Sequence, residues 1–172
     1  MNLLHDIDPG TVDEMNVIIE IPKGSKNKYE IDKKTGLIAL DRAMHSAQDY
    51  PFDYGFVPQT LWDDGDALDV VVLTTYPLAP GILVRVRPVA VMNMIDCGES
   101  DAKIIAVPCE DPRWKEVTDL PEVNKHTLKE IQHFFETYKQ IQNKEVKIDG
   151  IDNASKAQEA FEKAIKMYKD SR

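Results

Sequence analysis

The sequence is poor in cysteine, in positive charge and in long apolar runs. Its two cysteines, Cys97 and Cys109, are too few for a disulfide framework, which favours a reducing compartment where both are small, inert residues. The stretch MNLLHDIDPG has no basic segment followed by an apolar one, so we expect no signal peptide. No apolar run approaches the ~18 residues of a membrane helix. These absences predict a cytoplasmic protein with no membrane partner.

The shortage of positive charge also narrows the choice of partners. Lys and Arg number 21 against 30 Asp and Glu, which gives a formal net charge of -9. A nucleic-acid binder would show a basic patch, so we expect no nucleic-acid partner. An anion would need locally clustered cations or bound metal ions. The length of 172 residues, 42% of them apolar, fits one domain spanning residues 1–172.

Short β-branched segments bounded by Gly, Pro, Asp or Lys predict strands in the first part of the chain. These segments are 17–21, 28–32, 36–40, 69–75, 81–96 and 103–108. Pro88 interrupts the longest segment, which indicates an edge, a bulge or a corner between sheets. The short connection from this segment to the last one predicts antiparallel pairing.

The apolar period changes to three or four residues after Pro121. From Val123 to Ile141 it predicts an amphipathic helix of about five turns, capped by Asp119 or a neighbour. A strand over 145–150 and a second helix after it are expected next. Strands first and helices afterwards predict an α+β domain, with a small closed antiparallel barrel packed by the C-terminal helices.

The segment DDGDALDVVV (63–72) places four aspartates before an apolar run. Three of them follow the spacing D-x-D-x-x-D: Asp64, Asp66 and Asp69. The spacing alone fits a solvated Asp/Gly turn as well as a metal site. An EF-hand is excluded, because Leu68 and Thr75 stand where that loop needs ligands. Paired Cys or His ligands for zinc are missing, whereas carboxylates alone favour magnesium, manganese or calcium.

A second acidic pair, Asp96 and Asp101, flanks the turn CGES. A hairpin there would bring both carboxylates toward one spot, although a plain polar turn gives the same pattern. Basic and phenolic residues complete the inventory: Lys28, Arg42, Lys103, Lys139, Tyr50, Tyr54 and Tyr138. Each alone is typical of a surface cation or a core tyrosine. Together with the carboxylates they describe a phosphate-transfer site.

Several segments, in order and without large gaps, give the chain its resemblance to a known family. They are VIIEIPKGSKNKYEID (17–32), LDRAMHSAQDYPFDYGFVPQT (40–60), DGDALDVVVL (64–73), YPLAPGILVRVRPVAVMNMID (76–96), DAKIIAVP (101–108) and HFFETYK (133–139). Along nearly its whole length the chain resembles the family I soluble inorganic pyrophosphatases of prokaryotic type. The family signature usually has Pro or Glu where Ala67 stands here.

The resemblance implies a five-stranded barrel of the OB type with flanking helices. It also implies hydrolysis of pyrophosphate to two orthophosphates with several magnesium ions, for which manganese or zinc can substitute. In this reading Asp66 is the general base. The metal ligands are Asp64, Asp69, Asp96 and Asp101. The substrate-binding residues are Lys28, Arg42, Tyr54, Tyr138, Lys139 and Lys103, and further active-site positions are Glu20, Glu30 and Tyr50.

Relatives of this length are commonly hexamers, so the resemblance also implies a homohexamer. His133, in the predicted helix, fits a subunit contact or an ordinary helix surface. Two other functions remain open on the sequence. One is a non-enzymatic OB-like binder, and the other is a related phosphohydrolase acting on nucleotides or polyphosphate.

Overall fold

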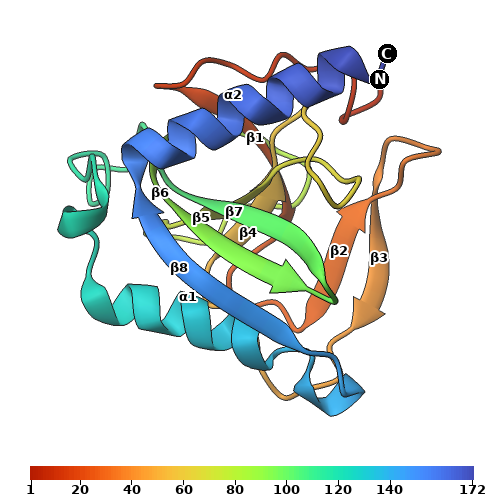
Figure 1. Ribbon diagram of the computed structural model, residues 1–172, viewed down its shortest axis with the longest axis vertical. Coiled ribbons are helices and arrows are strands. Elements are labelled where there is room, and N and C mark those ends of the chain that lie inside the picture. The colour runs from red at the N-terminus through yellow and green to blue at the C-terminus, as the bar shows by residue number, and fades with distance from the viewer.

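The computed structural model describes residues 1–172, and its centre is a mixed β-sheet that curls into a ring of five strands (Figure 1). The strands of the ring are β1 (Met15–Ile21), β4 (Asp53–Phe56), β5 (Asp69–Val72), β6 (Leu83–Asp96) and β7 (Glu99–Pro108). They pair in the order β1-β4-β5-β7-β6, and β6 pairs again with β1. The predicted ring of five strands with C-terminal helices is therefore confirmed.

The prediction that every strand pair is antiparallel is wrong at β5–β7, which is parallel. The chain passes from β5 through β6 and returns as β7 beside β5, so β7 runs in the direction of β5. The β6–β7 pair is antiparallel, as the short connection between them predicts. This arrangement brings the starts of β5 and β7 together at one end of the ring.

Strand β6 changes partners along its length. Residues 83–86 pair with β1, whereas residues 90–96 pair with β8 (Val146–Asn153). Between these two parts the register with β7 shifts at Pro88, which has no N–H to donate to a ladder. Of the three features predicted at Pro88, an edge, a bulge or a corner, the structure shows a register shift of the bulge type, and one long strand pairs both within the ring and with β8.

Strands β2 (Asn27–Ile31) and β3 (Ile38–Ala43) form a separate two-stranded sheet beside the ring (Figure 1). Strand β4 was not among the predicted strands, because four residues containing a glycine show no alternation. Gly55 is required there by close approach, since a Cβ atom at this position would lie 2.0 Å from the carbonyl oxygen of Ile18.

The predicted five-turn helix is shorter in the structure. Asp119 caps a separate 3-10 turn, η1 (Leu120–Glu122), and Asn124 caps α1 (Lys125–Thr137) by accepting hydrogen bonds from two backbone N–H groups. A second 3-10 turn, η2 (Gln140–Gln142), follows, and α2 (Ala154–Asp170) is the second predicted helix. Neither helix combines the length and the apolar character needed to cross a bilayer.

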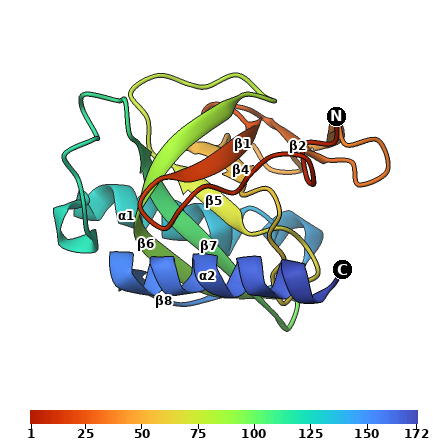
Figure 2. The ribbon, with the colours of Figure 1, turned by 90° about the horizontal axis from the view of Figure 1, so that it is seen from above.

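Alternate residues of the strands face two separate apolar cores. Val71 and Ile105 belong to the core that includes Phe134 and Phe135 of α1. Val70 and Ile104 belong to the core that Phe161 of α2 helps to fill. The two helices therefore cover different sides of the ring (Figures 1 and 2).

Candidate active site

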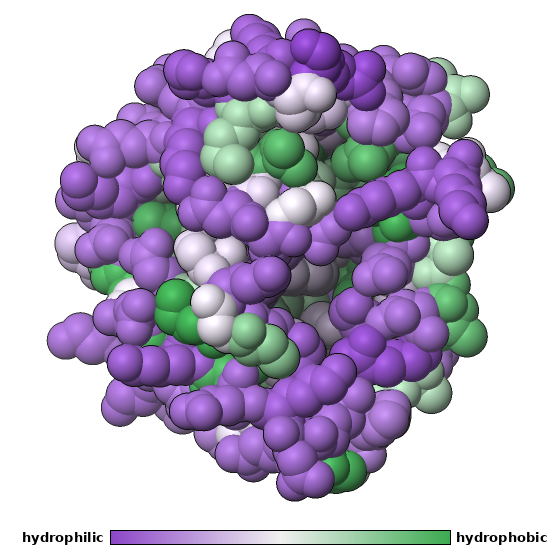
Figure 3. Space-filling view, turned by 45° about the vertical axis from the view of Figure 1, so that its right-hand side comes forward, coloured by the Kyte–Doolittle hydropathy of each residue, from purple (hydrophilic) through white to green (hydrophobic).

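A cavity of about 850 Å³ opens between the ring, the β2–β3 hairpin and the end of α1. The face of the molecule that carries the hairpin is hollowed, with a paler floor inside a hydrophilic rim (Figure 3). Twelve residues predicted for the site line this cavity. They are Glu20, Lys28, Glu30, Tyr54, Asp64, Asp66, Asp69, Asp96, Asp101, Lys103, Tyr138 and Lys139.

Three of these carboxylates converge although they come from separate segments. One carboxylate oxygen each from Asp64, Asp69 and Asp101 lies within 4.8 Å of the others. Asp69 begins β5 and Asp101 lies near the start of β7, so the parallel β5–β7 pair sets their separation. Asp64 reaches them from the loop before β5. All three residues were predicted from the sequence, and the fold brings them close together.

The loop around Asp64 satisfies both readings of the sequence. The Asp64 Oδ1 atom accepts a hydrogen bond from the Asp66 backbone N–H at 3.1 Å, and Gly65 takes a φ of 85° that favours glycine. The segment is therefore a turn in the ordinary sense. It also presents Asp64 to the two strand carboxylates. Ala67 packs beneath it against the small core cluster of Leu4, Ile18 and Phe56.

Lys103 carries a positive charge inside this cluster. Its Nζ donates to Asp69 Oδ2 at 2.9 Å, to both oxygens of Asp101 at 3.1 Å and to the Tyr54 hydroxyl at 2.7 Å. The residue is 2% exposed. Burial raises the pKa of Asp69. The charge of Lys103 lowers this pKa and the charge of Asp101 raises it, so the net effect is a rise. A bound cation would favour the ionised carboxylate and reverse that rise.

Aromatic rings form the floor next to these charges. Tyr54 and Tyr138 line the cavity, and Phe135 packs between their rings at centroid distances of 6.1 and 5.6 Å. Burial raises the pKa of both phenols, so each keeps its proton at neutral pH. The Tyr54 oxygen already accepts from Lys103, which leaves its own proton to be donated to a ligand.

Lysines also pair with acidic residues in two other parts of the cavity lining, on the β2–β3 hairpin and at the end of α1. Lys28 donates to Glu30 at 3.0 Å and to Asp41 at 3.1 Å, all on the β2–β3 hairpin. At the end of α1, Lys139 donates to Asp96 at 2.6 Å. The second oxygen of Asp96, Oδ1, is buried without a hydrogen-bond partner and therefore remains available to a ligand.

Two predicted residues do not line the cavity. Arg42 pairs with Asp41, with 2.5 Å between its NH1 atom and the Oδ2 atom of Asp41. Tyr50 is buried, and its ring centroid lies 4.7 Å from that of Phe134. Sequence reasoning missed Asp41, whose only signal is its place beside Arg42, and Lys33, which donates to Asp66 at 2.6 Å. Cys97 is exposed at the β6–β7 turn and lines the cavity, so it does not pack as a small apolar residue.

The lining carries more negative than positive charge, with ten carboxylates and five lysines among its residues. An anionic ligand would be repelled unless cations were added to it or to the protein. The converging cluster offers oxygen ligands alone, the donor set of hard divalent cations. Ligand oxygens around such an ion lie about 3 to 4 Å apart, which the 4.8 Å limit accommodates. The residues therefore fit divalent metal ions.

Comparison with known proteins decides the family. The sequence model of the inorganic pyrophosphatases matches residues 17–169. The chain belongs to the inorganic pyrophosphatase family. It is 45% identical over 171 residues to the inorganic pyrophosphatase of Picrophilus torridus, covering 98% of this chain and 97% of that protein. It is 48% identical over 166 residues to the soluble inorganic pyrophosphatase of Zea mays, covering 95% and 78%.

Solved pyrophosphatase structures share the fold. The crystal structure of inorganic pyrophosphatase from Thermus thermophilus superposes with a TM-score of 0.94 at 44% identity, covering 98% of this chain and 99% of that chain. The inorganic pyrophosphatase of Helicobacter pylori gives 0.91 at 44% identity, covering 96% and 99%. The ring of strands, the hairpin and the two helices are therefore the pyrophosphatase fold.

The buried Glu20 is expected to make the stability of this fold depend on pH. Burial and then the charge of Asp69 raise the Glu20 pKa from 4.5 to about 8, although the carboxylate accepts a hydrogen bond from the Ile31 N–H. Because the folded state holds this proton more tightly, its stabilising effect is full below pH 4.5 and is lost as pH rises to about 8. We expect the melting temperature of the metal-free protein to fall over that interval.

Glu20→Gln keeps the shape and the acceptor but cannot ionise, so its melting temperature should fall less across the same interval. Differential scanning fluorimetry in EDTA from pH 4.5 to 8.5 measures the difference. Parallel curves for the two proteins would show that Glu20 is already ionised in the folded state.

Proposed function

We propose that this chain hydrolyses inorganic pyrophosphate to two orthophosphates in the cavity described above, using divalent ions, with magnesium preferred and manganese or zinc as substitutes. The observation that carries the proposal is the convergence of three carboxylates in a cavity that also presents lysines and phenols. Carboxylates serve the cations, and lysines and phenols serve the phosphates.

The carboxylate cluster is the metal-holding part of this proposal. Asp64, Asp69 and Asp101 supply it, and Asp96 adds a further oxygen through its unpartnered Oδ1. When bound, divalent ions would neutralise phosphate charge and lower the pKa of coordinated water toward ~7. The protein contributes ligand atoms fixed on two strands and one turn.

The remaining polar groups serve the phosphates. Lys28 and Lys139 line the cavity, each partly exposed, so each can turn a proton toward an anion while keeping its carboxylate partner nearby. Tyr54 and Tyr138 donate phenolic protons to phosphate oxygens. These four groups stabilise charge that develops during cleavage of the phosphoanhydride bond.

Asp66 is the general base in this account. It stands in the loop between Asp64 and Asp69 and lines the cavity, and it forms an exposed ion pair with Lys33. A carboxylate there accepts a proton from the attacking water.

Arg42 acts through Asp41 and not by direct lining of the cavity. Its NH1 group holds Asp41, which in turn holds Lys28 at 3.1 Å. Arg42→Ala is expected to raise the KM for pyrophosphate by about tenfold, because a loosened Lys28 costs on the order of 1 kcal/mol or slightly more in binding. The magnesium concentration at half-activation should stay within about twofold. Steady-state kinetics at several magnesium concentrations separate the two, and an unchanged kcat/KM would remove Arg42 from substrate handling.

A substrate panel tests the proposed reaction against its rivals. Phosphate release should be rapid from pyrophosphate and at least about 10²-fold slower from ATP and tripolyphosphate at equal magnesium. Comparable release from ATP or tripolyphosphate would favour the broader phosphohydrolase. Absence of release, together with salt-sensitive binding of an oligonucleotide, would favour the binder.

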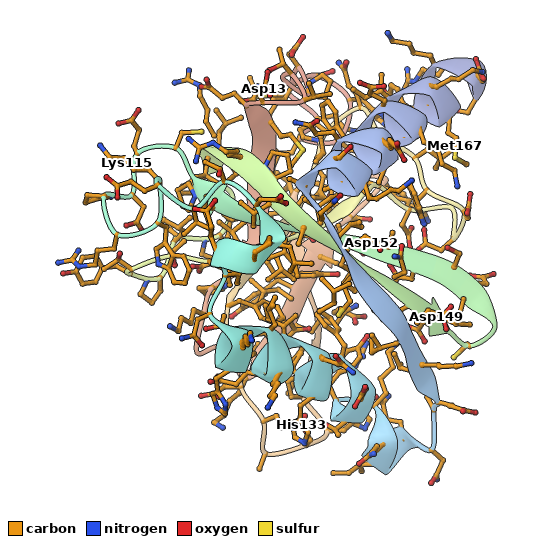
Figure 4. All side chains as sticks on the ribbon, turned by 60° about the vertical axis from the view of Figure 1, so that its left-hand side comes forward. Asp13, Lys115, His133, Asp149, Asp152 and Met167 are labelled. Atoms are coloured by element: carbon orange, nitrogen blue, oxygen red, sulfur yellow. The ribbon has the colours of Figure 1, made fainter.

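We also propose a cytoplasmic homohexamer, supported by three features. Tyr76, in the loop before β6, is 70% exposed and Leu83, the first residue of β6, is 43% exposed, apolar surface that subunit contacts would cover. His133 lies on the side of α1 turned away from the ring, where a neighbouring subunit can reach it (Figure 4). Both cysteines are free thiols, which suits a reducing compartment. Sedimentation equilibrium would contradict the hexamer if it gave the 19.5 kDa mass of one chain.

A further inference from the structure

The N–H donors of Lys103 are all directed to protein acceptors, which leaves none for a phosphate. An ammonium group has three N–H donors. The Nζ of Lys103 directs them to the Tyr54 hydroxyl, to Asp69 and to the two oxygens of Asp101, all between 2.7 and 3.1 Å. Its side chain is 3% exposed. A phosphate oxygen could bind it only by displacing one of these protein acceptors.

Two other lysines paired with carboxylates in this cavity are placed differently. The side chain of Lys28 is 22% exposed, and that of Lys139 is 16% exposed and paired with Asp96 alone. Both reach the open part of the cavity. Lys103 instead lies within the carboxylate cluster, against two of its three members.

The strands fix this position. Asp69 and Lys103 are direct partners in the parallel β5–β7 ladder. Asp101 and Lys103 are two residues apart on β7, so their side chains leave the same face of the strand. The rings of Tyr54 and Phe135 lie 5.3 and 5.2 Å from the Nζ and enclose it further. The ammonium is held where it contacts two carboxylates at once.

We propose that Lys103 is an internal counter-ion that holds Asp69 and Asp101 in place in the metal-free protein, and that it positions these ligands without binding phosphate. The proposal rests on the proposed function in one respect, that divalent cations occupy the cluster. Two largely buried carboxylates this close repel each other unless a cation lies between them. Lys103 supplies that cation before any metal enters, and its charge then weakens metal binding.

Lys103→Met tests the proposal in the absence of turnover. In EDTA the variant should melt about 10 °C below wild type, because two largely buried carboxylates lose their counter-ion. Saturating Mn²⁺ without substrate should raise its melting temperature by more than it raises that of wild type. The Kd for Mn²⁺, measured by calorimetry, should be about tenfold lower in the variant, since one nearby positive charge is gone.

Lys166→Met is the matched control, because Lys166 is an exposed lysine of α2 paired with Asp170 and remote from the cavity. It should match wild type in all three measurements. If Lys103→Met melts like this control, binds Mn²⁺ like wild type and has a KM for pyrophosphate raised tenfold or more, Lys103 is a phosphate ligand and the proposal is wrong.

A second variant covers the case in which Lys103→Met does not fold without metal. Adding Asp101→Asn removes one of the two carboxylate charges that lack a counter-ion in Lys103→Met. The double variant should therefore fold in EDTA and melt well above the single variant. A double variant no more stable than the single one would overturn the proposal. Melting and calorimetry need no substrate, so an inactive wild-type enzyme would remove the proposed function without deciding the role of Lys103.

Discussion

Asp69→Asn is expected to lower the magnesium-dependent kcat/KM for pyrophosphate by about 10²- to 10³-fold, a loss of roughly 3 to 4 kcal/mol in transition-state stabilisation. Asp69 belongs to the carboxylate cluster, is the partner of Lys103 in the β5–β7 ladder and accepts a hydrogen bond from the Lys103 Nζ. Asparagine keeps the volume and one oxygen but loses the charge that a hard cation requires. The magnesium concentration needed for half-activation should rise as well.

Asp63→Asn is the control for this change. Asp63 is six residues away, outside the cavity lining, and pairs with the exposed Lys163 at 3.0 Å. An exposed pair of this kind contributes ~0–1 kcal/mol, so activity should stay near wild type. If Asp69→Asn keeps the wild-type magnesium dependence, the carboxylate cluster is not the metal site.

Asp66→Asn should lower kcat by about 10²- to 10⁴-fold, the range for loss of a general base, while Mn²⁺ binding stays close to wild type. The separation is expected because Asp66 stands in the loop but is not one of the three converging carboxylates. Steady-state kinetics and calorimetry on the same preparation measure the two quantities.

Lys33→Gln distinguishes the loss of the base from the loss of its ion pair. It removes the 2.6 Å contact to Asp66 and leaves the carboxylate in place. Both side chains are more than half exposed, so the change should cost no more than about threefold in kcat. Near-normal turnover in Asp66→Asn, or equal losses in both variants, would remove the role of Asp66 as base.

The strands with clear β-branched runs could be predicted from sequence, and those without them could not. Strand β4 is short and contains Gly55, whose role depends on the approach of β1. The parallel β5–β7 pair depends on which strand closes the ring, information that no local pattern carries. The long helix was overestimated because its apolar period continues from Val123 to Ile141, whereas α1 starts after its cap Asn124 and the last residues of the period belong to the separate turn η2.

The candidate site shows the same division. The aspartates of the loop and the lysines were identified from their residue types and the family resemblance. Their proximity could not be predicted, because the three converging carboxylates come from two strands and a turn. Lys33 and Asp41 were missed because a surface ion pair and a wall residue look like any solvated charge in a turn or strand. Lys103 was grouped with the phosphate ligands, and only its contacts suggest a different role.

The most direct test of the account is phosphate release from pyrophosphate with magnesium titrated from zero, in protein first stripped with EDTA. The account predicts no release above background without metal and a saturable rise as magnesium is added. Release that is already complete in EDTA, or no release from folded protein at any magnesium or manganese concentration, would contradict a metal-dependent reaction in the carboxylate site.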